Sequence, residues 1–189
     1  MTVRDSLSGG FAAPALEAAR AFRAAMEAMA RPGTIREVAG AAPPAPLSPA
    51  AGALVLTLCD PSTPLHLAGE WDRAAVREWV AFHCGAPVVG AEDCAFALGP
   101  WEALLPLARF RAGTADYPDR AATLVVEVGR LEAEGARLSG PGIKGEARLS
   151  LPEPVAPLRE NARRFPLGVD LFLCCGSRIA ALPRSTGIA

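Results

Sequence analysis

The chain has 189 residues, with 19 basic and 20 acidic side chains, a net charge of −1 and 51% hydrophobic residues. This length and composition predict a single globular domain over residues 1–189, large enough to bury a core without disulfides or structural metals. The near-zero charge argues against a nucleic-acid binder, which usually carries a strongly basic face. The longest apolar stretch, residues 50–59, is half a membrane span, so we expect no membrane association.

The start of the chain and its cysteines indicate where in the cell the protein is located. No apolar signal core precedes Gly9 and Gly10, so export is not expected. The five cysteines are odd in number and none forms a C-x-x-C pair. We therefore expect a cytoplasmic protein with reduced thiols.

The first half of the chain carries clear helix signals. Pro14 suits a first helical turn, apolar residues follow at helical spacing, and Arg31-Pro32-Gly33 ends the helix. Ser48 and Pro49 are a typical N-cap and first helical residue for the apolar run to Cys59. A buried strand is the alternative for that run, because periodicity does not separate the two.

The rest of the chain alternates between predicted strands and helices. We expect Asp72 to cap a helix that ends at Gly85. The other expected helices are 101–108 and 155–165, and the expected strands are 64–67, 93–98, 123–128, 169–175 and 178–182. This order predicts an α/β fold with a layered mixed sheet flanked by helices.

The segment Gly140-Pro141-Gly142-Ile143-Lys144-Gly145 matches the dinucleotide pattern G-x-G-x-x-G. That pattern needs a helix opening at its end, whereas here Pro152 follows after six residues, so we predict a plain tight turn. Lys144 is the only lysine, and it lies between Ile143 and Gly145 in a polar turn, without the burial or cationic neighbour that a Schiff-base lysine requires. We therefore expect no pyridoxal phosphate (PLP) and no other cofactor.

The remaining reactive side chains do not form a recognisable catalytic pattern. His83 and Cys84 are neighbours on a helix and point about 100° apart, so they do not form a dyad. Cysteines and histidines lack the spacing of zinc ligands, and we expect no metal. Arg159 and Arg163 share a helix face that either grips phosphate or forms ordinary surface ion pairs, and nearby glutamates favour the second.

A series of short segments, in order from about residue 9 to 187, resembles the PhnH family of phosphonate-metabolism proteins. The segments are Phe22-Arg23, Ala28-Met29-Ala30-Arg31-Pro32-Gly33, Leu56-Thr57-Leu58 with Asp60, Phe82-His83-Cys84-Gly85, Ala95-Phe96-Ala97-Leu98, Gly113 with Tyr117-Pro118-Asp119 and Ala122-Thr123, Leu138-Ser139-Gly140-Pro141-Gly142-Ile143, Asn161, Phe165-Pro166-Leu167-Gly168-Val169-Asp170-Leu171, and Leu182-Pro183-Arg184 with Thr186. Each segment is weak alone, but the ordered set is specific.

The resemblance implies a subunit of the carbon–phosphorus lyase core complex, with the G, I and J subunits as partners. That complex joins an alkylphosphonate to the ribose of ATP, releases adenine and forms α-D-ribose 1-methylphosphonate 5-triphosphate. The H subunit is implied to be accessory to this transferase step. The family's fold is similar to the large domain of PLP-dependent transferases without the PLP site. In isolation we expect a homodimer that hides an exposed apolar patch.

Polar residues in turns are our candidates for a site that binds a ligand or a partner. They are Arg31, His83, Tyr117, Asp119, Ser139, Gly140, Gly142 and Arg184. Arg31 and Arg184 would contact phosphate or a partner's carboxylate. Each residue could instead stabilise only its own turn. The alternative function is a stand-alone enzyme, or a protein that binds a nucleotide or phosphonate, with a pocket near Arg31, Tyr117 and Arg184.

Overall fold

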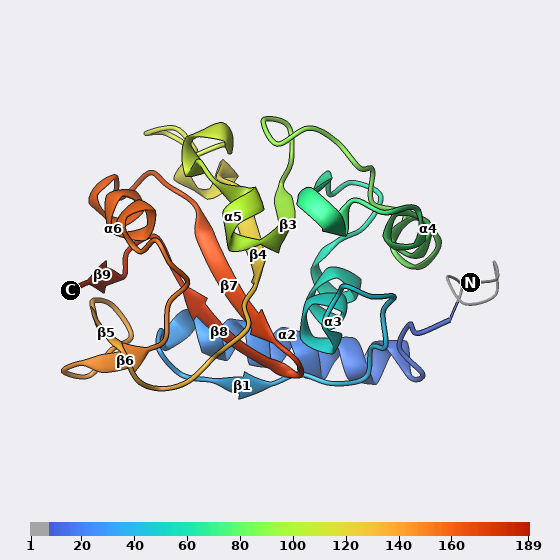
Figure 1. The fold of residues 1–189 in the computed structure, drawn as a ribbon, viewed down its shortest axis with the longest axis horizontal. Coiled ribbons are helices and arrows are strands. Elements are labelled where there is room, and N and C mark those ends of the chain that lie inside the picture. The colour runs from blue at the N-terminus through green and yellow to red at the C-terminus, as the bar shows by residue number, and fades with distance from the viewer. Residues whose placement is uncertain (1–7) are drawn as a thin grey trace.

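The computed structural model describes residues 8–189, so the part of the export prediction that rests on residues 1–7 lies outside the described residues. A six-stranded mixed sheet with the order β1-β8-β7-β4-β3-β2 forms the centre of the fold (Figure 1). Strands β2, β3, β4 and β7 are parallel, while β8 is antiparallel to both β7 and β1. The strands are β1 (Arg36–Glu37), β2 (Leu65–Leu67), β3 (Phe96–Pro100), β4 (Thr123–Glu127), β7 (Asp170–Cys175) and β8 (Arg178–Leu182).

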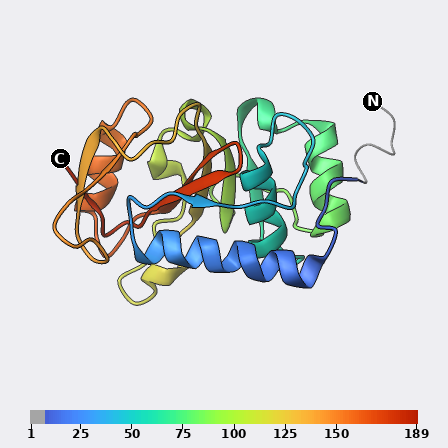
Figure 2. The same ribbon diagram turned by 90° about the horizontal axis from the view of Figure 1, so that it is seen from below.

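Both faces of this sheet are buried, as expected for a mainly parallel sheet. Val125 and Phe172 point toward helices α2 (Pro14–Ala30), α3 (Pro49–Leu58) and α4 (Ala74–His83). Their neighbours Leu124 and Leu171 point to the other side, where α5 (Trp101–Leu104) and α6 (Ala156–Arg163) lie. Figure 2 shows α2 running along one side of the sheet. The predicted α/β fold with a mixed sheet is confirmed.

The local signals of α3 explain why its apolar run is a helix. The Ser48 side chain accepts a hydrogen bond from the Ala51 N–H at 3.2 Å, and Pro49 occupies the first turn. Ala50 to Val55 are all buried, so the helix lies within the core. The helix is confirmed and the alternative strand is wrong.

Several predicted boundaries differ from the structure, and three of them have a clear physical reason. Asp72 does not cap α4, because the helix begins at Ala74 and the Asp72 carboxylate accepts a hydrogen bond from Arg77 instead. The strand predicted at 93–98 begins at Phe96, after a turn in which the Cys94 thiol donates to the Ala91 carbonyl. The helix predicted at 101–108 ends at Leu104, because Pro106 cannot continue it. A 3₁₀ turn, η2 (Leu107–Arg109), follows.

A second sheet, of three short antiparallel strands, was not predicted. It has the order β6-β5-β9, from β6 (Ala147–Leu149), β5 (Ala136–Ser139) and β9 (Gly187–Ile188). The segment 140–145 is the turn between β5 and β6, and Gly140, Gly142 and Gly145 have positive φ angles that favour glycine. The predicted turn is therefore confirmed, since a strand rather than a helix follows it.

Two further expectations concern the class of the fold. Among residues 8–189 there is no helix that is both long enough and apolar enough to cross a membrane. The likeness to the large domain of PLP-dependent transferases stays a prediction.

Candidate functional site

A large cavity lies at the carboxyl ends of β3 and β4, where open α/β sheets usually bind ligands. It has a volume of about 880 Å³. We call it the carboxyl-edge cleft, and its walls include Trp71, Trp101, Glu102, Glu127, Arg130 and Glu153. Trp71 closes the 3₁₀ turn η1 (Gly69–Trp71), Trp101 opens α5 and Glu127 is the last residue of β4. The sheet topology therefore brings together side chains that are distant in sequence.

Glu127 is a carboxyl group of this cleft with a shifted pKa. Its Oε1 accepts a hydrogen bond from the backbone N–H of Ser48, at the start of α3, at 2.7 Å. Burial nevertheless raises the pKa of Glu127 above its ordinary value, outweighing that hydrogen bond. The buried indole Nε1 of Trp71 faces the same carboxylate but does not reach hydrogen-bonding geometry. Within the described chain no lysine or arginine forms an ion pair with Glu127.

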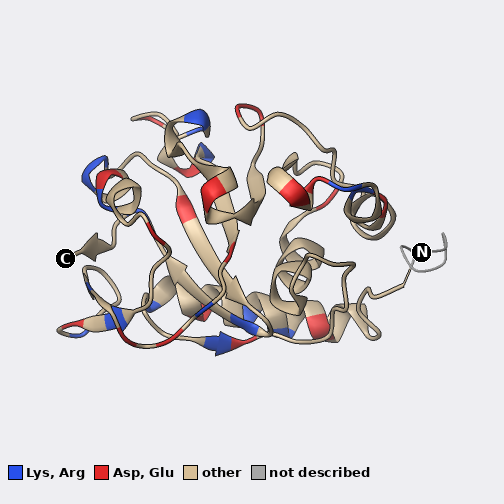
Figure 3. Ribbon diagram, viewed as in Figure 1, with Lys and Arg blue, Asp and Glu red and all other residues tan. Residues whose placement is uncertain are grey.

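The charge around the cleft is mainly negative. Glu102, Glu127, Glu134 and Glu153 line it, against the single cation Arg130. The Arg130 guanidinium donates to Glu132 at 2.7 Å and is also paired with Glu134. Figure 3 shows acidic segments on α5 and at the end of β4. This arrangement suits a cationic group and repels a polyphosphate or phosphonate.

The raised pKa of Glu127 leads to a prediction about pH. The native state holds this proton more tightly than the unfolded chain, so stability falls as pH rises from the ordinary value of 4.5 through the raised pKa. Glu127→Gln keeps the acceptor for Ser48 and removes the titration. We expect the variant to match the wild type at pH 4 and to become progressively more stable than it toward pH 8. Urea unfolding midpoints across this range test it, and a pH-independent difference would contradict it.

A second depression lies at the opposite, amino edge of the sheet. It has a volume of about 470 Å³ and runs between α2 and the first residues of β3, β4 and β7. We call it the α2 groove, and its apolar walls include Phe22, Met26, Met29, Leu58, Phe96 and Phe172. Phe22 is 48% exposed and Met26 is 52% exposed, at adjacent turns of the same helix face. Such an exposed apolar stripe is typical of an interaction surface.

The structure brings the predicted residues Arg31, Ser139, Gly140 and Gly142 into one neighbourhood. A Cβ on Gly142 would lie 2.1 Å from the Ala30 carbonyl, so the β5–β6 turn packs directly on the end of α2. A Cβ on Gly140 would lie 2.9 Å from the Ser185 carbonyl, which brings the C-terminal segment to the same place. Arg31 and Ser139 are exposed there. Whether this neighbourhood binds a ligand stays a prediction.

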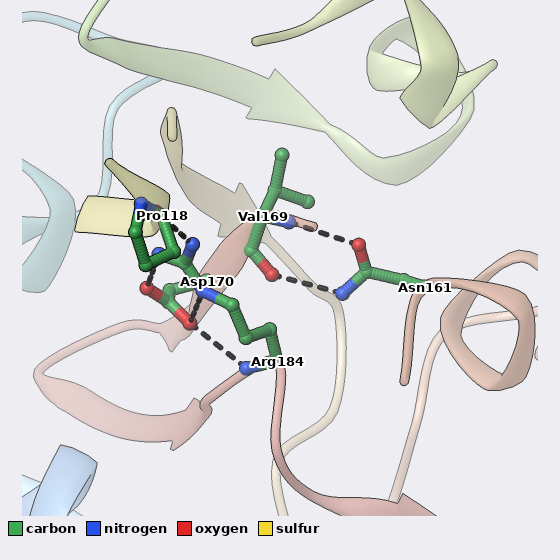
Figure 4. Close-up of polar contacts among 5 residues, drawn as sticks. All are labelled: Pro118, Asn161, Val169, Asp170 and Arg184. Carbon is green, nitrogen blue, oxygen red and sulfur yellow. Dashed lines mark hydrogen bonds and ion pairs between the residues drawn. The ribbon is translucent and has the colours of Figure 1, made fainter. Parts of the chain in front are cut away.

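Tyr117, Asp119 and Arg184 form a second group beside the first, connected to it through residues 185–187. The Arg184 guanidinium donates to the Asp170 carboxylate and to the Pro118 carbonyl, and the Arg184 backbone N–H donates to Asp170 at 2.8 Å (Figure 4). These bonds occupy the guanidinium and favour a structural role for Arg184. Tyr117 stays exposed, with the Arg120 guanidinium 4.0 Å from its ring centroid.

His83 belongs to neither group. Its ring lies against Gly10 and is tilted by 54° against the Trp79 ring, with centroids 5.1 Å apart, and its Nε2 lies 3.3 Å from the Ser8 carbonyl oxygen. It is the last residue of α4, far along the chain and in space from the β5–β6 turn (Figure 1). The structure thus brings seven of the eight predicted residues into two adjoining groups and leaves His83 apart.

Lys144 and the thiols lie as the sequence led us to expect. Lys144 is exposed in the β5–β6 turn. All five cysteines are free, and burial raises the pKa of Cys59 to about 12 and that of Cys94 to about 11. Across residues 8–189, no three His, Cys, Asp or Glu side chains gather as metal ligands do. Arg159 and Arg163 are exposed on α6.

Three important residues were missed by sequence reasoning. Glu127 was included in a core strand, although a carboxylate that ends an apolar run is itself a signal of a strand end facing a cleft. Trp71 belongs to no sequence motif, because its place in the cleft depends on packing near the end of β4, which is distant in the chain. Asn161, quoted only within the family resemblance, is buried and bonds both backbone groups of Val169 (Figure 4).

Comparison with known proteins shows the family to which the chain belongs. Residues 9–189 match the family described as "Bacterial phosphonate metabolism protein (PhnH)". The alpha-D-ribose 1-methylphosphonate 5-triphosphate synthase subunit PhnH of Rhizobium meliloti (strain 1021) is 42% identical over 195 residues, covering 98% of each chain. HtxG of Stutzerimonas stutzeri, named provisionally as a C-P lyase subunit protein, is 37% identical over 175 residues, covering 89% of this chain and 84% of its own. The chain therefore belongs to the PhnH family of bacterial phosphonate metabolism proteins.

Proposed function

We propose that this protein is an accessory subunit of a cytoplasmic carbon–phosphorus lyase complex that degrades alkylphosphonates. Its partners are the G, I and J subunits, and the complex makes α-D-ribose 1-methylphosphonate 5-triphosphate from ATP and methylphosphonate. The observation that carries the proposal is the similarity to a named synthase subunit along nearly the whole chain. The protein uses no PLP in this role and serves assembly rather than the bond-breaking step.

The α2 groove supports a role in assembly. It combines three exposed or half-exposed apolar side chains of α2 with an apolar floor from the sheet. Burying such a stripe against another chain removes apolar surface from water, which is the main source of free energy in stable interfaces. In the absence of other subunits, a second copy of the chain covers the same groove as a homodimer.

A complementation experiment tests the proposed function. A bacterial strain that lacks its own H subunit is supplied with this chain and grown with methylphosphonate as the only phosphorus source. We expect growth to be restored. Absence of growth, with the chain expressed and folded, contradicts the proposal.

The exposed position of Lys144 leads to a prediction about cofactor chemistry. Lys144→Ala removes the only lysine side chain that could form a Schiff base, and because Lys144 is exposed the change costs little stability. We expect the variant to support growth on methylphosphonate at the wild-type rate in the same strain. Loss of growth with normal expression would indicate that Lys144 takes part in the chemistry.

A further inference from the structure

We propose that the carboxyl-edge cleft receives an arginine side chain from a partner subunit, and is thus a second docking site, separate from the α2 groove. The inference rests on the proposed function, because it requires a partner chain. The two depressions lie at opposite edges of the sheet, at the carboxyl ends of β3 and β4 and at the amino ends of β3, β4 and β7. A subunit with both sites can contact its neighbours in the complex from two sides.

The negative charge of the carboxyl-edge cleft favours the binding of a cationic group. Glu102 and Glu127 form no ion pair within residues 8–189, and the only arginine on the wall, Arg130, is already bonded to Glu132 and Glu134. A carboxylate held in a partly buried place without a cation is costly, and a partner's cation removes that cost. An anionic substrate has the opposite effect, so this cleft does not hold the phosphonate or the triphosphate.

The shape and chemistry of the walls favour guanidinium over ammonium. Trp71 offers an aromatic surface next to the Glu127 carboxylate, and a guanidinium both stacks on aromatic rings and binds carboxylates with two parallel hydrogen bonds. The volume of about 880 Å³ exceeds one side chain and accommodates the neighbouring residues of the inserted segment as well. Trp101 and Val155 provide apolar wall for those residues.

Binding of the purified G, I and J subunits to immobilised wild-type and variant chains tests this inference. Glu127→Gln and Glu102→Gln each remove one charge and retain size, and Glu127→Gln also keeps the acceptor for the Ser48 N–H. We expect Glu127→Gln to weaken binding at least about tenfold and Glu102→Gln, at the exposed rim, about threefold. Glu78→Gln, on the exposed side of α4 and outside the cleft, is the matched control and is expected to change nothing.

Competition with a small guanidinium compound tests whether the cleft binds an arginine side chain. L-argininamide chloride should reduce wild-type binding more than sodium chloride does at equal ionic strength. It should have no such extra effect on the Glu102→Gln/Glu127→Gln double variant. Wild-type affinity and salt dependence in the double variant would overturn this inference while leaving the proposed function intact. Failure of the wild-type chain itself to bind the other subunits would overturn both.

Discussion

Replacing Asn161 by alanine is expected to lower the free energy of unfolding by about 3 kcal/mol. The Asn161 amide donates to the Val169 carbonyl at 2.8 Å and accepts from the Val169 N–H at 2.9 Å, and both residues are buried. Without this side chain, two buried backbone groups lose their partners, and each unsatisfied group costs about 1–3 kcal/mol. These two hydrogen bonds, which we call the Asn161 clamp, also fix the neighbouring Asp170. Asp170 is the first residue of β7 and binds Arg184.

Urea unfolding followed by circular dichroism measures this effect. Arg159→Ala, an exposed change on the same helix, is the control and is expected to stay within about 0.5 kcal/mol of the wild type. Asn161→Asp retains an acceptor for the Val169 N–H but places a carboxylate against the Val169 carbonyl at a buried position, so it should not restore the stability that the alanine variant loses. An alanine variant as stable as Arg159→Ala would show that the clamp is unimportant.

Replacing Phe22 by aspartate is expected to weaken binding of the partner subunits about 100-fold. Phe22 is nearly half exposed on α2, so the folded chain tolerates the charge, whereas a bound partner would bury it without a counter-ion. A loss of this size corresponds to about 2.7 kcal/mol, within the range of interface residues that dominate binding. The homodimer should dissociate as well, because it uses the same groove.

Sedimentation and binding to immobilised partners measure both effects. Ala81→Asp places the same charge on an exposed position of α4 outside the groove and should leave affinity and mass unchanged. The unfolding midpoint of each variant shows whether folding is preserved. Wild-type affinity in a folded Phe22→Asp variant would exclude the α2 groove as the interface.

Elements with strong local signals were predictable from the sequence. The Ser48-Pro49 start of α3, the helical spacing of α2 and the apolar run of β4 depend on residues close in the chain, and all three are present. The hairpin of β7 and β8 was predicted for the same reason, since Gly176 and Ser177 mark its turn. Local propensity, capping and turn chemistry suffice for elements of this kind.

Elements and sites that depend on distant partners were not predictable. Strands β6 and β9 have three and two residues, and only their pairing with β5 distinguishes them from loops. The cleft around Glu127 arises because η1, α5 and the end of β4 meet in space. The likeness of short segments to the PhnH family identified the chain, but it did not indicate which edge of the sheet carries each depression.

The most direct test of the assembly role compares reconstituted G, I and J subunits with and without this chain. Particle mass is measured together with adenine release from ATP and methylphosphonate. We expect omission of the chain to prevent the G, I and J subunits from assembling with one another, while adenine release persists. Intact assembly of the remaining subunits together with loss of adenine release would contradict it, because the chain would then act in the chemistry itself.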